Sequence, residues 1–89
     1  MNGIITVLGK DKVGIIAKVC VYLSENGINI LDISQTIVQG YFNMMMIVDM
    51  ENSSIAFETA HQGLTDLGNE IGVEIKLQHE AIFDSMHRI

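Results

Sequence analysis

The hydrophobic pattern of this chain alternates between strand and helix periodicity in a fixed order, and that order constrains the fold more than any other feature. Short or alternating apolar runs, typical of strands, occupy four segments: 4–8, 28–39, 41–50 and 73–78. In 13–25 and 52–71, apolar residues recur every three or four positions, as in amphipathic helices. Glycines separate these segments. The predicted order is β-α-β-β-α-β.

This order predicts an α+β fold. A right-handed crossover through each helix places both helices on one face of a four-stranded antiparallel sheet, which is the ferredoxin-like sandwich. With 89 residues, the chain is expected to form one domain, in which residues 3–79 build the core. Residues 80–89 are expected to form an amphipathic helical tail. A change of phase in the apolar positions predicts a β-bulge near Asp32, and Gly40 predicts a tight hairpin.

The sheet face opposite the helices is expected to be apolar too. Its predicted side chains are Ile30, Val38, Met45 and Ile47. An apolar second face needs a cover, from the tail or from another subunit. A domain of this size also leaves part of its apolar surface unburied, and 48% of the residues are hydrophobic. We therefore expect a homo-oligomer, most simply a dimer.

Composition argues against several classes of protein. Five Lys and Arg residues against eleven Asp and Glu give a net charge of −6, which disfavours binding to nucleic acid. The uninterrupted apolar runs are too short for a membrane helix, which needs about 20 residues. They are also too short for the apolar region of a secretory leader, which needs about 7–15. Cys20 is the single cysteine, so no disulfide framework is expected. These features predict a cytoplasmic protein without a membrane partner.

Candidate catalytic and metal-binding residues are few. His61, His79 and His87 lack the spacing of a metal-binding pair on a helix. Cys20 falls on the apolar stripe of the first helix, where a packing role is favoured over a reactive thiolate. The serines do not match a Gly-x-Ser-x-Gly nucleophile elbow. We expect no catalytic residue, no metal and no cofactor, and hence no enzymatic activity.

The loop from Gly9 to Gly14 lies between a predicted strand and a predicted helix, where a phosphate-binding loop would be. Such a loop needs Lys and Ser or Thr directly after its last glycine, but Ile15 and Ile16 follow here. Free N–H groups at the helix start, beside Lys10 and Lys12, instead favour a small anion or a carboxylate. The alternative is a plain turn in which Asp11 caps the helix.

Three segments carry a resemblance to a known family. Val7-Leu8-Gly9-Lys10-Asp11-Lys12-Val13-Gly14-Ile15-Ile16-Ala17, Asn26-Gly27-Ile28-Asn29-Ile30 and Asp32-Ile33 resemble the ACT domain, a small amino-acid-sensing module of metabolic enzymes and transcription regulators. The resemblance covers essentially the whole chain, although Val13 replaces a proline found in many members. The chain is more closely similar to stand-alone bacterial and archaeal ACT proteins related to the glycine cleavage system repressor.

The resemblance implies a ligand site at a dimer interface. Two groups of residues match the family's pocket, one in the loop and one at the start of the second strand: Asp11, Val13, Gly14 and Ile15, and Asn29, Ile30 and Asp32. In the predicted topology, the first helix separates the two groups. A symmetry-related subunit would have to bring its strand to the loop. A polar Asn between two isoleucines is also a common turn residue.

Two functions from different classes follow. The first is a regulatory module that senses an amino acid or a similar small metabolite and transmits its state to a partner. The second is a dimerisation or protein-interaction module without a ligand. An acylphosphatase-like enzyme on the same fold would need an arginine near the first strand, whereas the single arginine is Arg88.

Overall fold

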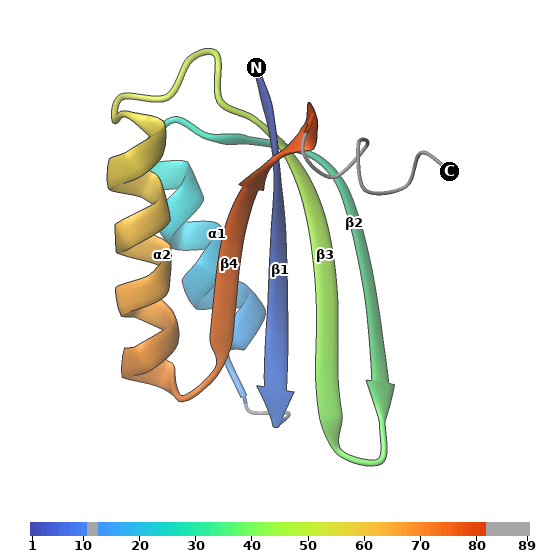
Figure 1. Ribbon diagram of the computed structural model, residues 1–89. Coiled ribbons are helices and arrows are strands. Elements are labelled where there is room, and N and C mark those ends of the chain that lie inside the picture. Colours follow the sequence, from blue (N-terminus) through green and yellow to red (C-terminus); the bar gives the residue numbers. More distant parts are fainter. Residues whose placement is uncertain (11–12, 82–89) are drawn as a thin grey trace.

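The computed structural model describes residues 1–10 and 13–81, and its elements follow the predicted order (Figure 1). The strands are β1 (Asn2–Lys10), β2 (Asn29–Val38), β3 (Tyr41–Asp49) and β4 (Glu74–His79). The helices are α1 (Ile15–Glu25) and α2 (Phe57–Ile71). The predicted tail lies almost entirely outside the described residues.

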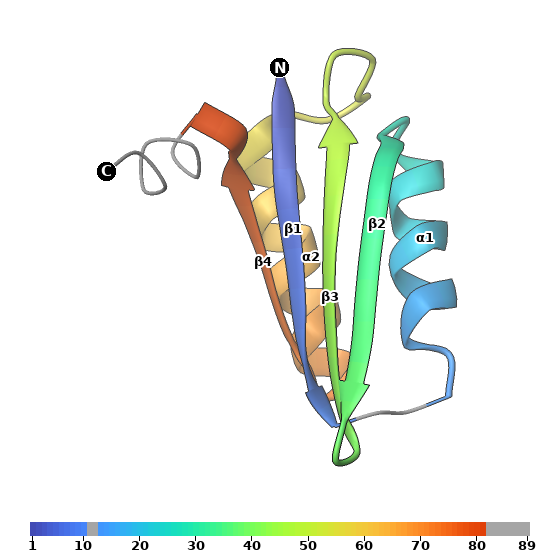
Figure 2. The same cartoon turned by 90° about the vertical axis from the view of Figure 1, so that its right-hand side faces the viewer.

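The strands form one antiparallel sheet in the order β2-β3-β1-β4, which confirms the ferredoxin-like topology. Both helices lie on the same side of this sheet (Figure 1). The other side, here called the open face, is turned toward the viewer in Figure 2. Because β1 and β3 are central, β2 and β4 form the two edges.

The core lies between the sheet and the two helices. Met44 and Met46 of β3 are fully buried and pair with Val7 and Ile5 of β1. The helices add further buried side chains: Ile15, Val19 and Leu23 from α1, and Ala60 and Leu64 from α2. Gly68 allows the last turn of α2 to approach β4 closely, since a Cβ there would lie 2.7 Å from the Val73 carbonyl oxygen. The predicted helical stripes therefore do form the core.

The predicted bulge is present in β2, and it changes which side chains face the helices. The register with β3 shifts between Ile30 and Asp32. Ile30 pairs with Val48, a buried core residue, and packs against the core. The expectation that Ile30 lies on the open face was wrong, because the extra residue at the bulge reverses the alternation of the strand.

Both helices begin later than the sequence pattern predicts. Gly14, with φ of 89°, is the N-cap of α1, and Asp11, the expected cap, lies outside the described residues. Helix α2 starts at Phe57 rather than at residue 52. The Ile55 N–H donates to Ser53 Oγ over 3.2 Å, and Ser53 Oγ donates to the Ile55 carbonyl over 2.8 Å. This local serine turn competes with helix formation.

The predicted hairpin between β2 and β3 is a two-residue turn. Gln39 and Gly40 both adopt positive φ, 51° and 80°, and Val38 pairs with Tyr41 across the turn. Two consecutive left-handed residues are typical of a type I′ turn, whose twist matches that of the strands.

Candidate functional site

Helix α1 starts at the end of the sheet where β1 stops and the β2–β3 hairpin turns (Figure 1). The buried Ile15 anchors the first turn, with 3% of its surface exposed. The first helical hydrogen bond runs from the Lys18 N–H to the Gly14 carbonyl over 3.0 Å. The N–H groups of Ile15, Ile16 and Ala17 precede this bond, so they have no acceptor within the helix. The start of α1 therefore presents backbone donors and a positive helix dipole.

A groove lies between the start of α1 and the second half of β2. Its volume is about 460 Å³, and its lining comes from three elements: Gly14, Ile15, Ile16 and Ala17 of the α1 start, Gln35 and Ile37 of β2, and Phe42 of β3. Phe42 is buried, whereas Gln35 and Ile37 are exposed. Apolar walls with a small number of polar groups are typical of small-molecule sites. Among the lining residues, Gln35 supplies the polar side chain.

Sequence reasoning missed Gln35, Ile37 and Phe42 as groove residues. Strand β2 has 10 residues and α1 has 11. A strand rises about 3.3 Å per residue and a helix 1.5 Å, so the strand is about twice as long as the helix. Its second half must therefore return past the start of the helix. The lengths of the two segments were enough to predict that the end of the strand lies near the start of the helix. The predicted site, however, included only residues at the start of the strand.

The structure brings some of the expected site residues together and separates others. Gly14 and Ile15 line the groove. Val13 is fully exposed and borders a smaller hollow of about 180 Å³, which also includes Lys18 and Glu70. Asp11 lies outside the described residues.

The remaining expected residues lie at the far end of β2. Asn29 is exposed and pairs with Asp49, and Ile30 is half-buried. The Asp32 carboxylate accepts the Ile33 N–H over 2.8 Å at the bulge. Within one subunit, these residues are remote from the groove, as the topology predicts.

The other candidate side chains form no reactive cluster in the described ranges. His79 stacks on Phe57 with ring centroids 3.9 Å apart, and His61 is exposed on α2. His87 falls outside the described part of the chain. Cys20 is half-buried and packs against the core. Residues 1–10 and 13–81 contain no group of three metal-ligating side chains and no helix able to cross a membrane.

Comparisons with known proteins identify the family. The ACT domain family model matches residues 3–78. A UPF0237 protein of Bifidobacterium longum is 60% identical over 88 residues, which cover 99% of this chain and 98% of that protein. A UPF0237 protein of the archaeon Methanocaldococcus jannaschii is 46% identical over 86 residues, covering 97% and 96% of the two chains.

Comparisons with solved structures support the same family assignment. An ACT domain protein from Streptococcus pneumoniae superposes with a TM-score of 0.82 at 42% identity, covering 93% of each chain. A formyltetrahydrofolate deformylase from Pseudomonas syringae shares the fold with a TM-score of 0.80 at 19% identity, over 86% of this chain and 26% of that one. A protein proposed to be a glycine cleavage system transcriptional repressor gives 0.76 at 22% identity, over 86% and 44%. The chain therefore belongs to the ACT domain family, among the UPF0237 proteins.

Proposed function

We propose that this protein is a non-catalytic regulatory module that binds an amino acid or a similar small metabolite at a subunit interface. The observation that carries the proposal is the groove between α1 and β2, where backbone donors at a helix start adjoin apolar walls. An amino acid has the matching chemistry, with a carboxylate beside a side chain. The carboxylate would meet the N–H groups of Ile15 and Ile16, where the helix dipole favours negative charge.

The edge strand β2 suggests how a second subunit would complete this site. Residues 31–38 are all exposed, and Ile33 and Ile37 leave apolar surface on the helix side of the edge. An open edge offers unpaired backbone groups to another strand. If two copies pair through antiparallel β2 strands, the start of one strand lies beside the end of the other. Asn29 and Asp32 of the second copy would then lie at the end of the sheet that carries the groove. Their side chains are turned toward the open face, so the ammonium group would have to reach them across the β2 edge.

Sensing requires a partner that reads the bound state. In the deformylase, the matching region is about a quarter of the chain, and in the protein proposed to be a repressor it is under half. The present chain instead matches nearly the full length of its UPF0237 relatives. We propose that it passes its ligand state to a partner protein.

A titration with matched variants tests the groove. Thermal-shift measurements with each of the common amino acids identify a ligand, since binding to the folded state raises the melting temperature. Isothermal titration then compares the wild type with Ala17→Leu and Val21→Leu. Both positions are exposed on α1, but only Ala17 lines the groove. We expect Ala17→Leu to lose binding and Val21→Leu to retain it.

Asn29→Ala tests the contribution of the second copy. It should weaken binding by about 1–3 kcal/mol, the cost of an unpaired buried polar group.

Equal binding by wild type and Ala17→Leu would place the site elsewhere.

The alternative function is a dimerisation or protein-interaction module without a ligand. The exposed Ile33, Ile37 and Val38 of β2 favour it, because an apolar strand edge is a pairing surface by itself. If no amino acid shifts the melting temperature or gives heat in the titration, this alternative replaces the sensing proposal.

A further inference from the structure

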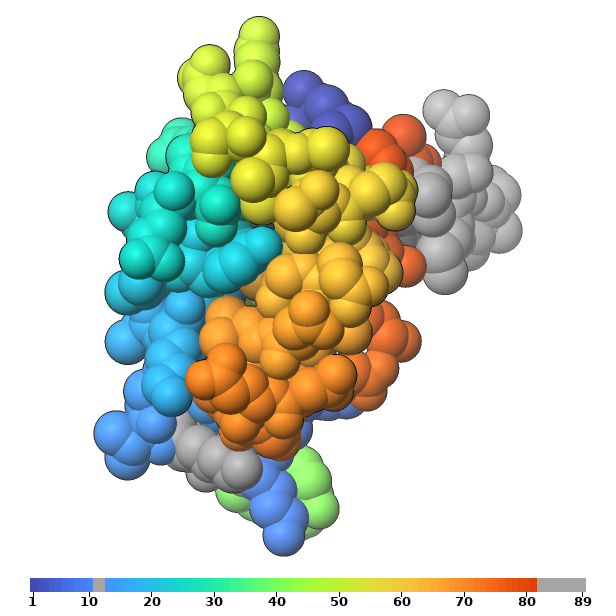
Figure 3. Space-filling view, turned by 90° about the vertical axis from the view of Figure 1, so that its left-hand side faces the viewer, coloured from blue at the N-terminus to red at the C-terminus, as the bar shows by residue number. Residues whose placement is uncertain are grey.

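The outer surface of the helix layer has a groove of its own, here called the helix groove. Helices α1 and α2 lie side by side on this surface (Figure 3), and Tyr22 of α1 occupies the space that Gly63 of α2 leaves open. The helix groove has a volume of about 350 Å³ and runs between the two helices. Its floor is apolar, with Ala17, Val21 and Tyr22 from α1 and Leu67 from α2.

The floor leaves apolar surface open to a partner. Val21 is 55% exposed, although it stands beside Ala17 on one face of α1, four residues further along. Tyr22 and Leu67 are half-buried and pack against the core, so they form a firm base for the groove. A concave apolar surface between two helices is suited to receive apolar side chains.

Carboxylates line the two ends of the helix groove. Glu25 is the last residue of α1, whereas Glu70 lies near the start of that helix, where it shares the smaller hollow with Gly14 and Lys18. The helix axis rises 1.5 Å per residue, so the distance along α1 from Lys18 to Glu25 is about 10 Å. The helix groove therefore follows about two turns of α1 and has an acidic side chain at each end.

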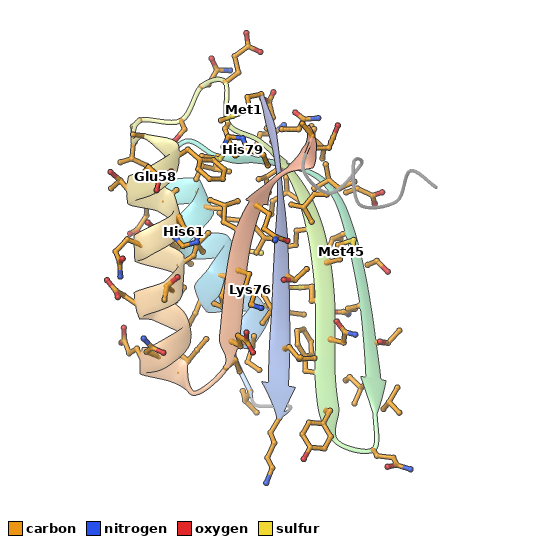
Figure 4. All side chains as sticks on the ribbon, viewed as in Figure 1. Met1, Met45, Glu58, His61, Lys76 and His79 are labelled. Carbon is orange, nitrogen blue, oxygen red and sulfur yellow. The ribbon has the colours of Figure 1, made fainter. Side chains whose placement is uncertain are left out.

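Acidic side chains outnumber basic ones around the helix groove. Lys18 is the cation of its lining. Burial and the nearby Asp66 carboxylate both raise the pKa of Tyr22, which places a third carboxylate at the edge of the groove. Glu58, on the first turn of α2 (Figure 4), adds negative charge further along the same layer.

These carboxylates are available to a cationic partner. Among residues 1–10 and 13–81, the ion pair that forms is Lys76–Glu74 on β4, so no carboxylate of the helix layer is paired with a cation there. An apolar floor bordered by unpaired acidic groups has the charge complementary to basic side chains.

The charge around the helix groove selects among possible occupants. Nucleic acids and anionic lipids carry negative phosphate groups, which the carboxylates repel. A second copy that presents its own helix layer would bring a matching set of carboxylates, in a chain with a net charge of −6. A basic amphipathic helix of another protein has the complementary chemistry, with apolar side chains for the floor and Lys or Arg for the acidic ends.

We propose that the helix groove binds a basic amphipathic helix of a partner protein. Apolar residues of that helix cover Val21 and Leu67. Two basic residues about two turns apart, at positions i and i+7, lie beside Glu25 and Glu70. The groove thus serves the proposed function, on which this assignment rests, as the surface where a partner reads the ligand state. Ala17 lines both the helix groove and the groove beside β2, so α1 is shared by the two sites.

Selection from a displayed library of random helical peptides tests the proposal. The library is panned on the immobilised wild-type protein, with no amino acid added. We expect the enriched peptides to carry Lys or Arg at i and i+7, with apolar residues at i+3 and i+4 between them. Fluorescence anisotropy then measures the affinity of an enriched peptide in solution, which should fall as salt is raised because salt screens the ion pairs.

A charge-reversed variant and its matched control test the acidic ends. Glu25→Lys/Glu70→Lys reverses both ends of the helix groove and should weaken peptide binding by about tenfold or more, because like charges then meet. Glu51→Lys/Glu58→Lys makes the same change of net charge at two exposed residues outside the lining, and it should change the affinity much less.

A second pair of variants tests the apolar floor. Val21→Glu places a charge on the floor while it adds negative charge to the protein, so it should lose binding even though the overall attraction to a basic peptide increases. Leu31→Glu makes the same change of charge at an exposed apolar residue of β2 and should retain binding. Circular dichroism checks that each variant is folded.

Three results would overturn the proposal. The first is a selection that enriches no basic amphipathic pattern. The second is an enriched peptide that binds Val21→Glu and Glu25→Lys/Glu70→Lys as tightly as it binds the wild type. The third is a lower mass for Val21→Glu than for the wild type in sedimentation equilibrium, since this would identify a second copy as the occupant.

The peptide experiment and the amino-acid screen fail independently. Peptide binding is measured without amino acid, so a thermal-shift screen that finds no ligand removes the sensing function and leaves the helix groove as a docking site. A selection that fails while an amino acid binds removes the docking site and leaves the sensing function.

Discussion

The Tyr22 hydroxyl lies directly against the backbone of Gly63, so α1 and α2 meet where one helix has no side chain. A Cβ built on Gly63 would overlap with this hydroxyl and would come within 2.7 Å of the ring carbon that bears it. Glycine inside a helix is normally unfavourable by about 1 kcal/mol relative to alanine. Its presence at Gly63 is explained by the space that Tyr22 occupies.

Gly63→Ala should therefore lower the free energy of unfolding, by about 1–2 kcal/mol, because Tyr22 is forced out of its place. In a Tyr22→Ala background the same change should be neutral or stabilising by up to about 1 kcal/mol, since the clash is gone and the helix propensity remains. Urea unfolding of the four proteins at one chain concentration measures the coupling. Additive effects would show that the two residues do not constrain each other.

Burial raises the pKa of Tyr22 above its ordinary value of 10.0, and the nearby Asp66 carboxylate raises that pKa further. Tyr41 is the other tyrosine, so ultraviolet titration of Tyr41→Phe reports Tyr22 alone. Its midpoint should exceed 10.0 in the folded protein and return toward 10.0 in urea. In Asp66→Asn the midpoint should fall partway, because the effect of burial remains.

The same shift predicts a loss of stability in alkali. The folded state holds the Tyr22 proton more tightly than the unfolded state. The contribution of this proton to the free energy of unfolding is therefore fully present below pH 10. It is lost as the pH rises from there through the folded-state pKa. Tyr22→Phe should remove this part of the alkaline destabilisation, as measured by urea midpoints across the range. An identical pH dependence in both proteins would contradict the assignment.

The hairpin offers a stabilising substitution. Gln39 adopts φ of 51°, a left-handed conformation that costs most non-glycine residues about 1–2 kcal/mol. Asn tolerates it better, and Asn-Gly is a favoured type I′ pair. Gln39→Asn should raise the free energy of unfolding by about 0.5 kcal/mol. Gln39→Val should lower it, because β-branched residues resist positive φ. Thermal unfolding of both variants checks the sign of each change.

Gly14 is constrained by its backbone rather than by its surroundings. Its φ is 89°, and a Cβ there would meet no atom within 4 Å in the described structure. Gly14→Val should therefore destabilise the fold by about 1–3 kcal/mol through strain alone. Gly14→Asn should cost less, as Asn accepts left-handed backbone. Melting temperatures of the two variants distinguish the two causes. Backbone strain predicts a smaller loss for Asn than for Val, whereas steric exclusion of the side chain predicts similar losses for both.

Much of the architecture follows from local pattern. The periodicity of Ile15, Val19 and Leu23 predicted α1, and the alternation of Met44, Met46 and Val48 predicted the buried side of β3. The change of phase around Asp32 predicted the bulge. The helix starts were less predictable, because the Ser53 turn and the left-handed Gly14 compete with helix formation over a few residues.

What the sequence determined by itself is the order of elements and the inward face of most of them, because side-chain periodicity follows from backbone geometry within each segment. What only the tertiary structure decided is which segments meet. The bulge placed Ile30 on the core side, and the length of β2 carried Gln35 and Ile37 past the start of α1 to form the groove. These positions depend on register and on the relative lengths of neighbouring elements, which no single segment encodes.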